Sequence, residues 1–352
     1  MNPTTPQNLS DLSQLQGQIV DVFAVLRRSE RREAKNGNPY WNLSLADHES
    51  AIDGRIWSND EQAAATIVDL EPGTAVKIRG EVDSYKDKLQ LVVKRIRAIE
   101  ENEAGYDAAA LYGDAPTWLD ALSCRSLVFD IETVPNAEIR DLPPTIVKAL
   151  SEHCERKDRD QSMVMGLSPF FGKTVSLAFA EGETELDKQE VTALVVPPAG
   201  ADDAALPDWI RPMSEAELLQ CFWELAARAE LVITYNGRGF DLPFLVARSL
   251  IHGIPARVDL ISDRWGLRPH LDLFDLVGQR GRGPSNLDVV CWALDIRSPK
   301  GEMDGSMVAP AYERGEFEQI ALYNREDVRA TTAVYHRVRD SVLRYRRDWI
   351  RG

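Results

Sequence analysis

The sequence predicts an α/β protein in which a small five-stranded β-barrel domain precedes a larger domain with a mixed central sheet. Three observations support this prediction. Residues 17–99 alternate as short strands separated by turn signals, whereas strands and helices follow one another from residue 126 onward. Charge also changes along the chain, because residues 17–99 hold 13 basic and 13 acidic residues, and residues 101–352 hold 28 and 41. A length of 352 residues has room for two domains.

The amino-terminal pattern is that of an OB-fold. The stretches "GQIVDVFAVLRRSERR", "YWNLSLADHES" and "AIDGRIWS" read as three strands, and "NDEQAAATIVDL" reads as a helix. Two further strands follow in "TAVKIRGEVDSYKDKLQLVVKRIRAIE". Five strands with one helix between the third and fourth is the order of a barrel that binds oligonucleotides. The stretch resembles the nucleic-acid-binding OB domains attached to bacterial nucleases and helicases.

The barrel offers candidate contacts for a single nucleic-acid strand. Tyr85 and Lys86 occupy the last hairpin, and Trp57 could stack on a base for roughly 1–3 kcal/mol. A basic cluster precedes the first turn: Arg27, Arg28, Arg31, Arg32 and Lys35. The alternative is that Trp41 and Trp57 are core residues and that the domain contacts a protein or the other domain.

Domain boundaries follow from these changes in pattern. We expect a flexible leader over 1–16, the OB-fold over 17–100, a linker over 101–123 and the larger domain over 124–352. The start lacks the basic and apolar segments of a signal peptide, no apolar run suggests a membrane span, and the four cysteines are far apart. We therefore expect a cytoplasmic protein with no membrane partner. A net charge of −15 argues against non-specific coating of nucleic acid.

The larger domain begins with "LVFDIET", an apolar strand that carries two acids. Side chains alternate along a strand, so Val128, Asp130 and Glu132 share one face. Two like charges on one face of an inner strand repel each other and lose hydration unless a cation lies between them.

Two further acids lie near helices. In "NGRGFD", Asp241 stands where it could simply cap the next helix. In the last helix, Asp327 falls on the apolar stripe, and Tyr323 lies one turn earlier on the same face. The stripe is predicted to comprise Ile320, Val334, Val338, Val342 and Tyr345. A sulfur-free cluster of four carboxylates suits Mg²⁺ or Mn²⁺, and two such ions can clamp a phosphodiester.

At these residues the chain resembles the DEDD superfamily of 3′–5′ exonucleases, in the branch with a tyrosine in the third motif. The motifs are "FDIET", "NGRGFD" and "YNRED", and residues 126–340 resemble the predicted exonucleases akin to the proofreading domain of B-family DNA polymerases. The resemblance implies a ribonuclease H-like fold for the larger domain.

The resemblance also implies roles for individual residues. Asp130 would bridge two metal ions, Glu132 and Asp327 would hold the ion that activates water, and Asp241 would act through the second ion. Tyr323 would orient the attacking water or help to deprotonate it. The candidate contacts of the terminal nucleotide are Thr133, Asn236 and Phe240.

The sequence as a whole predicts a metal-dependent 3′–5′ exonuclease that releases nucleoside 5′-monophosphates from single-stranded ends by a two-metal mechanism. DNA is favoured over RNA as the substrate. Two alternatives stay open: a 3′–5′ exoribonuclease, and a non-catalytic subunit that binds nucleic acid or recruits a protein through the OB domain.

Overall fold

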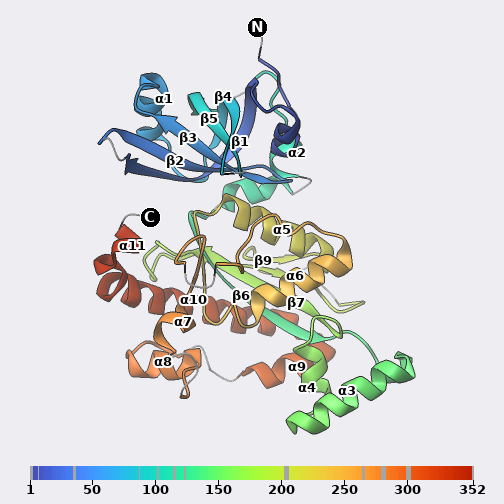
Figure 1. The fold of residues 1–352 in the computed structure, drawn as a ribbon. Helices are drawn as coiled ribbons and strands as arrows, with labels where there is room; N and C mark the ends of the chain where they lie inside the picture. The colour runs from blue at the N-terminus through green and yellow to red at the C-terminus, as the bar shows by residue number, and fades with distance from the viewer. Residues whose placement is uncertain are drawn as a thin grey trace.

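A computed structural model describes residues 3–6, 8–34, 37–86, 88–100, 103–113, 116–122, 124–201, 206–263, 266–278, 283–298 and 303–350. Its amino-terminal part is a closed barrel with the strand order β1-β2-β3-β5-β4. The strands are β1 (Ile19–Glu33), β2 (Pro39–Ala46), β3 (Ala51–Trp57), β4 (Ala75–Tyr85) and β5 (Lys88–Ala98). Helix α1 (Glu61–Thr66) lies between β3 and β4, so the predicted OB-fold is confirmed (Figure 1).

Alternating apolar residues fill the barrel. Val20 and Val22 of β1 are buried against Leu43 and Leu45 of β2, as the pattern of each strand predicts. The β4–β5 pairing shifts register at Gly80, where a Cβ atom would lie 2.8 Å from the carbonyl oxygen of Val92. The absence of a side chain there lets the two backbones approach and the sheet curl into a barrel.

The two domains contact each other through β1. Arg27 is 7% exposed and donates a hydrogen bond of 3.3 Å from Nη2 to the carbonyl oxygen of Ala226. Burial lowers the pKa of Arg27 to about 10. The expectation that Arg27 belongs to a nucleic-acid-binding cluster is therefore wrong, because its guanidinium faces the larger domain. Lys35 of that cluster lies outside the described residues. In Figure 1 the barrel lies directly above that domain.

The segment between the domains is partly helical. Helix α2 (Ala108–Tyr112) is followed by the 3₁₀ turn η3 (Thr117–Leu122). The guanidinium of Arg228 lies 3.8 Å from the centre of the Tyr112 ring, and Arg257 donates a 3.0 Å hydrogen bond to the Tyr112 carbonyl oxygen. The connection thus packs against the larger domain.

A six-stranded mixed sheet forms the larger domain, in the order β11-β10-β6-β7-β8-β9. Strand β7 runs antiparallel to β6 and β8, and the other neighbouring pairs are parallel. The bounds are β6 (Ser126–Pro135), β7 (Gly172–Glu181), β8 (Thr192–Val195), β9 (Ile210–Pro212), β10 (Leu231–Thr234) and β11 (His270–Asp272). The α/β class with a mixed central sheet is confirmed, although the alternation of apolar residues did not predict the three-residue strand β9.

Helices cover both faces of the sheet. Helices α5 (Glu215–Arg228) and α6 (Asp241–His252) pack on Leu127, Phe129 and Ile131 of β6. Helix α10 (Phe317–Ser341) covers the face that bears Val128 (Figure 1). The other helices and 3₁₀ turns are η1 (Leu9–Gln14), η2 (Ile67–Asp69), η4 (Ile139–Asp141), α3 (Pro144–Lys157), α4 (Gln161–Gly166), α7 (Leu273–Val277), α8 (Leu287–Ala293), η6 (Gly305–Met307), α9 (Val308–Glu313), η7 (Leu343–Tyr345) and α11 (Arg347–Ile350).

The predicted apolar stripe of the last helix is wrong at its end. Helix α10 stops at Ser341, so the helical register no longer holds for Val342 and Tyr345. These two side chains are 45% and 72% exposed, whereas Ile320, Val334 and Val338 are buried.

All four cysteines are free and buried. Among the described residues, no helix combines the length and the apolar character that a membrane span needs.

Phe129 is the apolar centre of the sheet face beneath α5, and its ring lies 4.8 Å from that of Phe222. We expect Phe129→Ala to lower the free energy of unfolding by about 3–5 kcal/mol through the cavity it creates. Phe170→Ala, at a side chain that is 71% exposed, should change it by less than about 0.5 kcal/mol. Urea titration followed by circular dichroism measures both, and equal effects would contradict the packing described.

Candidate active site

Three acids from two elements meet beside the centre of the sheet. Asp130 and Glu132 project from β6, and Asp327 projects from α10. One carboxylate oxygen of each residue lies within 4.8 Å of the corresponding oxygens of the other two. The two β6 residues share a face because they are two apart, and the helix that covers this face brings the third.

The position of Asp327 follows from the packing of α10. Val328 and Val334 anchor the helix on the sheet, and Ile320 packs against Val134 and Val175 near the end of β6. Asp327 lies among these contacts and is 9% exposed. Tyr323, one turn earlier, packs on the edge of the same apolar group.

Asp241 approaches from the other side of β6. It is the first residue of α6, and the cap position before it is Phe240, which makes no side-chain cap. The Asp241 Oδ1 atom instead accepts a hydrogen bond of 3.3 Å from the backbone N–H of Ile131. The helix-cap explanation of Asp241 is therefore wrong. Asp241 stands outside the 4.8 Å group but is close enough for its charge to raise the pKa of Asp130 and Glu132.

Asp272 holds the loop that leads to Asp241. Its carboxylate accepts hydrogen bonds from three backbone N–H groups, at 2.8 Å from Asn236, 2.9 Å from Arg238 and 3.0 Å from Phe274. Asp272 ends β11, and the loop follows β10, its parallel neighbour in the sheet. The two are brought together only in the folded chain.

His270 has a structural place beside this loop. Its ring bonds the Thr234 hydroxyl at 2.8 Å and the Leu260 carbonyl oxygen at 3.0 Å. Burial lowers the pKa of His270 to about 3, so the ring is neutral at physiological pH.

Burial and mutual repulsion make the cluster a poor place for negative charge. Burial raises the pKa of Asp130 well above its usual value, and the carboxylates of Asp241, Asp327 and Glu132 raise it further. Burial and the charges of Asp327 and Asp241 act in the same direction on Glu132, and burial raises the pKa of Asp241 to about 7. A divalent cation would remove this penalty, so the donor set fits a hard metal ion.

Tyr323 is held as a neutral phenol. Burial raises its pKa, and the charges of Asp327, Glu132 and Asp130 raise it further, together with a hydrogen bond to Asp327. In the metal-free protein the hydroxyl is therefore a hydrogen-bond donor.

The predicted nucleotide contacts near the cluster have other structural partners. The hydroxyl of Thr133 donates a 2.8 Å hydrogen bond to the carbonyl oxygen of Gly166. Asn236 adopts a φ of 64° at the turn, and Gly237 follows where a Cβ would lie 2.5 Å from Thr234. Phe240 packs against the core with its ring 5.6 Å from that of Phe244.

On the barrel, the structure adds a residue that the sequence analysis missed. The guanidinium of Arg55 lies 5.5 Å from the Tyr40 ring, 5.3 Å from the Trp57 ring and 5.5 Å from the Tyr85 ring. Trp57 is 36% exposed and Tyr85 is 53% exposed, and Lys86 lies 5.4 Å from the Tyr85 ring. The signal was available, because Arg55 and Trp57 are two residues apart and share a strand face.

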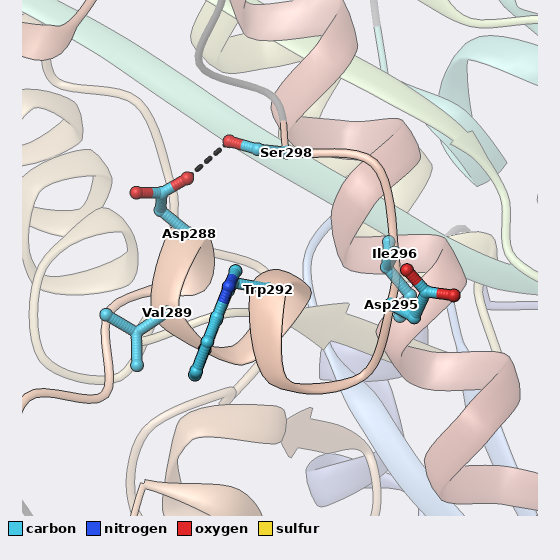
Figure 2. Close-up of a pocket in the computed structure, with 6 residues that line it drawn as sticks. All are labelled: Asp288, Val289, Trp292, Asp295, Ile296 and Ser298. Carbon is cyan, nitrogen blue, oxygen red and sulfur yellow. Dashed lines mark hydrogen bonds between the residues drawn. The ribbon is translucent and has the colours of Figure 1, made fainter.

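A separate hollow lies on α8 and the loop after it. Figure 2 shows Trp292 between the carboxylates of Asp288 and Asp295, with Val289, Ile296 and Ser298 around them. The Ser298 hydroxyl is hydrogen-bonded to Asp288. None of the four clustered acids lines this hollow.

Residues 175–344 match the family described as "Predicted 3'-5' exonuclease related to the exonuclease domain of PolB", and residues 15–99 match "OB-fold nucleic acid binding domain". Both parts of the resemblance predicted from the sequence are thereby confirmed. The exonuclease match contains Asp241, Tyr323 and Asp327. Asp130 and Glu132 precede it, so their membership of the site depends on the geometry above.

Individual relatives match shorter parts or match loosely. The 3'-5' exoribonuclease YhaM of Bacillus licheniformis is 32% identical over 87 residues, which are 25% of this chain and 27% of that protein. The family B DNA polymerase from Pyrobaculum calidifontis matches 90% of this chain and 45% of its own, with 14% identity and a TM-score of 0.43. A domain of replication protein A from Methanococcus maripaludis covers 28% of this chain and 98% of its own, with 19% identity and a TM-score of 0.23.

The buried Asp241 carboxyl predicts a pH-dependent stability of the metal-free protein. Its folded pKa of about 7 exceeds the ordinary 3.8, so the folded state keeps a proton that the unfolded state releases. The free energy of unfolding should therefore fall as pH rises from about 4 to 7, by at most about 4 kcal/mol from this group. Asp241→Asn should remove that part of the slope in urea titrations with chelator present.

Asp340→Asn is the matched control. Arg339 lowers the pKa of the Asp340 carboxyl below 3.8, so its contribution to stability is complete above that pH. This variant should follow the wild-type slope between pH 4.5 and 7.5. A wild-type slope that Asp241→Asn leaves unchanged would contradict a penalised carboxylate at 241.

Proposed function

We propose that this chain, in which an OB-fold domain precedes an exonuclease domain of the PolB-related type, is a metal-dependent 3′–5′ exonuclease. The observation that carries the proposal is the convergence of Asp130, Glu132 and Asp327 within 4.8 Å, with Asp241 beside them. Two of these acids are buried and two, Asp130 and Glu132, are half-buried. Ordinary folding gives no reason to gather four such carboxylates, because each one raises the free energy of the others. A shared pair of divalent cations supplies that reason.

The resemblance to the exonuclease family implies the roles of the residues. Asp130 would hold both cations, Glu132 and Asp327 the first, and Asp241 the second. Bound there, Mg²⁺ or Mn²⁺ would lower the pKa of a water molecule and stabilise the leaving oxygen of a phosphodiester. Tyr323 forms a hydrogen bond with Asp327 and would orient the attacking water or help to deprotonate it, with the metal lowering the pKa of the water. Hydrolysis of the last phosphodiester would release a nucleoside 5′-monophosphate.

We favour a DNA strand with a free 3′ end as the substrate, because the matched family is described as related to an exonuclease domain of a DNA polymerase. RNA is the second candidate, since a relative that matches a quarter of this chain is named an exoribonuclease. The acid cluster acts on phosphate, which both nucleic acids share. Selection between them depends on contacts to the 2′ position.

The barrel would guide the strand to the site. Arg55, Trp57, Tyr40 and Tyr85 form a surface of three rings around one guanidinium, which we call the Arg55 face. Aromatic rings stack on bases, and a guanidinium can bind phosphate or stack as well. Lys86 would add a positive charge at its edge. In this proposal residues 17–100 bind the nucleic-acid strand, residues 101–123 connect the two domains, and residues 124–352 cleave the strand.

Activity on end-labelled oligonucleotides tests the proposal. We expect wild-type protein with Mg²⁺ or Mn²⁺ to shorten single strands from the 3′ end, and chelator to abolish the reaction. Asp327→Asn should lower kcat by at least about a thousandfold, because its charge holds the cation needed for chemistry. Parallel single- and double-stranded DNA and RNA substrates would identify the preferred one on a sequencing gel.

Asp340→Asn lies on the same helix at an exposed position and serves as the control, with wild-type activity expected. Unchanged digestion by Asp327→Asn would refute the assignment of the site. Binding without cleavage by wild-type protein would favour the non-catalytic alternative.

Affinity for longer strands tests the Arg55 face. Trp57→Ala in the full chain should weaken binding of a single strand of about 20 nucleotides by roughly 5- to 150-fold, as expected for the loss of one stacked base. The kcat on a short oligomer should stay close to wild type, because the acid cluster is unchanged. Fluorescence anisotropy measures the affinity.

Val68→Ala is the control, since Val68 is an apolar residue of the barrel domain that is 66% exposed and lies outside the Arg55 face. Equal affinity for wild type and Trp57→Ala would show that the barrel serves another purpose, such as binding a protein.

A further inference from the structure

We propose that Asn324 is a positioning residue that fixes the Asp130 carboxylate for metal binding, and that Ser176 fixes Asn324 in turn. The inference rests on the proposed function, because it assigns Asp130 to a metal site. Asn324 follows Tyr323 directly in α10 and is fully buried, and Ser176 is buried to the same degree in β7.

A continuous pair of hydrogen bonds joins the three residues. The Asn324 Nδ2 atom donates to Asp130 Oδ2 at 2.7 Å, and the Ser176 hydroxyl donates to Asn324 Oδ1 at 2.9 Å. The contact with Asn324 is also the interaction that lowers the pKa of Asp130 against the effects that raise it. The amide is thus the polar group that favours the charged form of this carboxylate.

The chemistry of the neighbours decides which way the amide faces. An Asn side chain offers one acceptor oxygen and one donor nitrogen. A reversed amide would place its oxygen 2.7 Å from a carboxylate oxygen, where two acceptors repel each other. The Ser176 hydroxyl can donate to the amide oxygen, so it supports the observed orientation. Ser176 therefore acts through Asn324 and not on Asp130 itself.

These bonds connect the elements that carry the acids. Ser176 pairs in register with Glu132 across β6 and β7, and Asn324 belongs to the turn of α10 that carries Tyr323 and Asp327. One amide therefore ties the third motif to the first. With Oδ2 bonded to a fully buried amide, the Asp130 carboxylate cannot rotate without breaking that bond. The Asp130 carboxylate is therefore held in its orientation before a cation binds, which reduces the conformational entropy lost on binding.

The prediction concerns metal affinity. Loss of a hydrogen bond to a charged group should weaken Mn²⁺ binding by the full chain, and we expect Asn324→Leu to raise the Kd at least about tenfold. The metal concentration for half-maximal nuclease activity should rise in parallel, and kcat at saturating Mn²⁺ should fall much less. Isothermal titration with Mn²⁺ alone measures the affinity without reference to activity.

Ser176 supplies a second pair of variants with a smaller change in the core. Ser176→Ala removes the donor to Asn324 and should weaken Mn²⁺ binding about two- to fivefold, whereas Ser176→Thr keeps a hydroxyl and should restore most of it. The control is Thr332→Val, a buried site on the same helix whose hydroxyl bonds Val328 and Gln189 at 2.9 Å each. It should bind Mn²⁺ as wild type does, so a merely destabilised helix is distinguished from a displaced ligand.

The possible outcomes separate this inference from the proposed function. Wild-type Kd in folded Asn324→Leu overturns the positioning role and leaves the nuclease proposal intact. If Asn324→Leu does not fold, Ser176→Ala and Ser176→Thr decide the question. The positioning role is overturned if these two variants bind Mn²⁺ with the same Kd. A further outcome is that the wild type cleaves no nucleic acid while the variants bind Mn²⁺ more weakly than it does. That result supports the positioning role of Asn324 and refutes the nuclease proposal. A wild type that binds no Mn²⁺ overturns the inference.

Discussion

The gathering of four carboxylates at one strand, two of them buried and two half-buried, is the constraint on which the rest of the structure depends. Each of them would be more stable in water or next to a base, and in the metal-free protein burial raises the pKa of Asp130, Glu132 and Asp241 and so favours their neutral forms. Such an arrangement persists only where the surrounding fold holds it firmly. Two hydrophobic layers do so here, one on each face of the sheet. The free energy gained by burying apolar surface in these layers offsets the cost of placing the carboxylates together.

Polar groups outside the cluster then refine its shape. Asp272 collects three backbone N–H groups and so fixes the turn before Asp241. Asn324 donates a hydrogen bond to one oxygen of Asp130, and the Ser176 hydroxyl holds Asn324 in that orientation. Neither residue is a candidate ligand, yet both decide where ligands point. Such support is common around metal sites, because a cation gains more from ligands that are already in place.

The contact between the domains shows how one residue type can have opposite roles in one strand. Arg27 of β1 is buried against α5, whereas Arg28 and Arg32 pair with Glu30 at 3.0 and 2.5 Å. The arginine cluster of the sequence therefore does not form one basic surface. The Arg55 face, with its three rings and one guanidinium, suits a nucleic-acid strand better than the arginine cluster of β1 does.

Local pattern was sufficient for the fold class, for the five barrel strands and for the acids Asp130, Glu132 and Asp327, because strand alternation and helical spacing are properties of neighbouring residues. It failed at the end of α10, where the helix stops and the register that placed Tyr345 is lost, and at Asp241, where a helix cap was an equally good explanation. The roles of Arg55, Asp272, Asn324 and Ser176 depend on contacts between residues up to 194 positions apart. A hydrogen bond between distant residues leaves no periodic trace in the chain, so only the tertiary structure decides which polar side chain meets which.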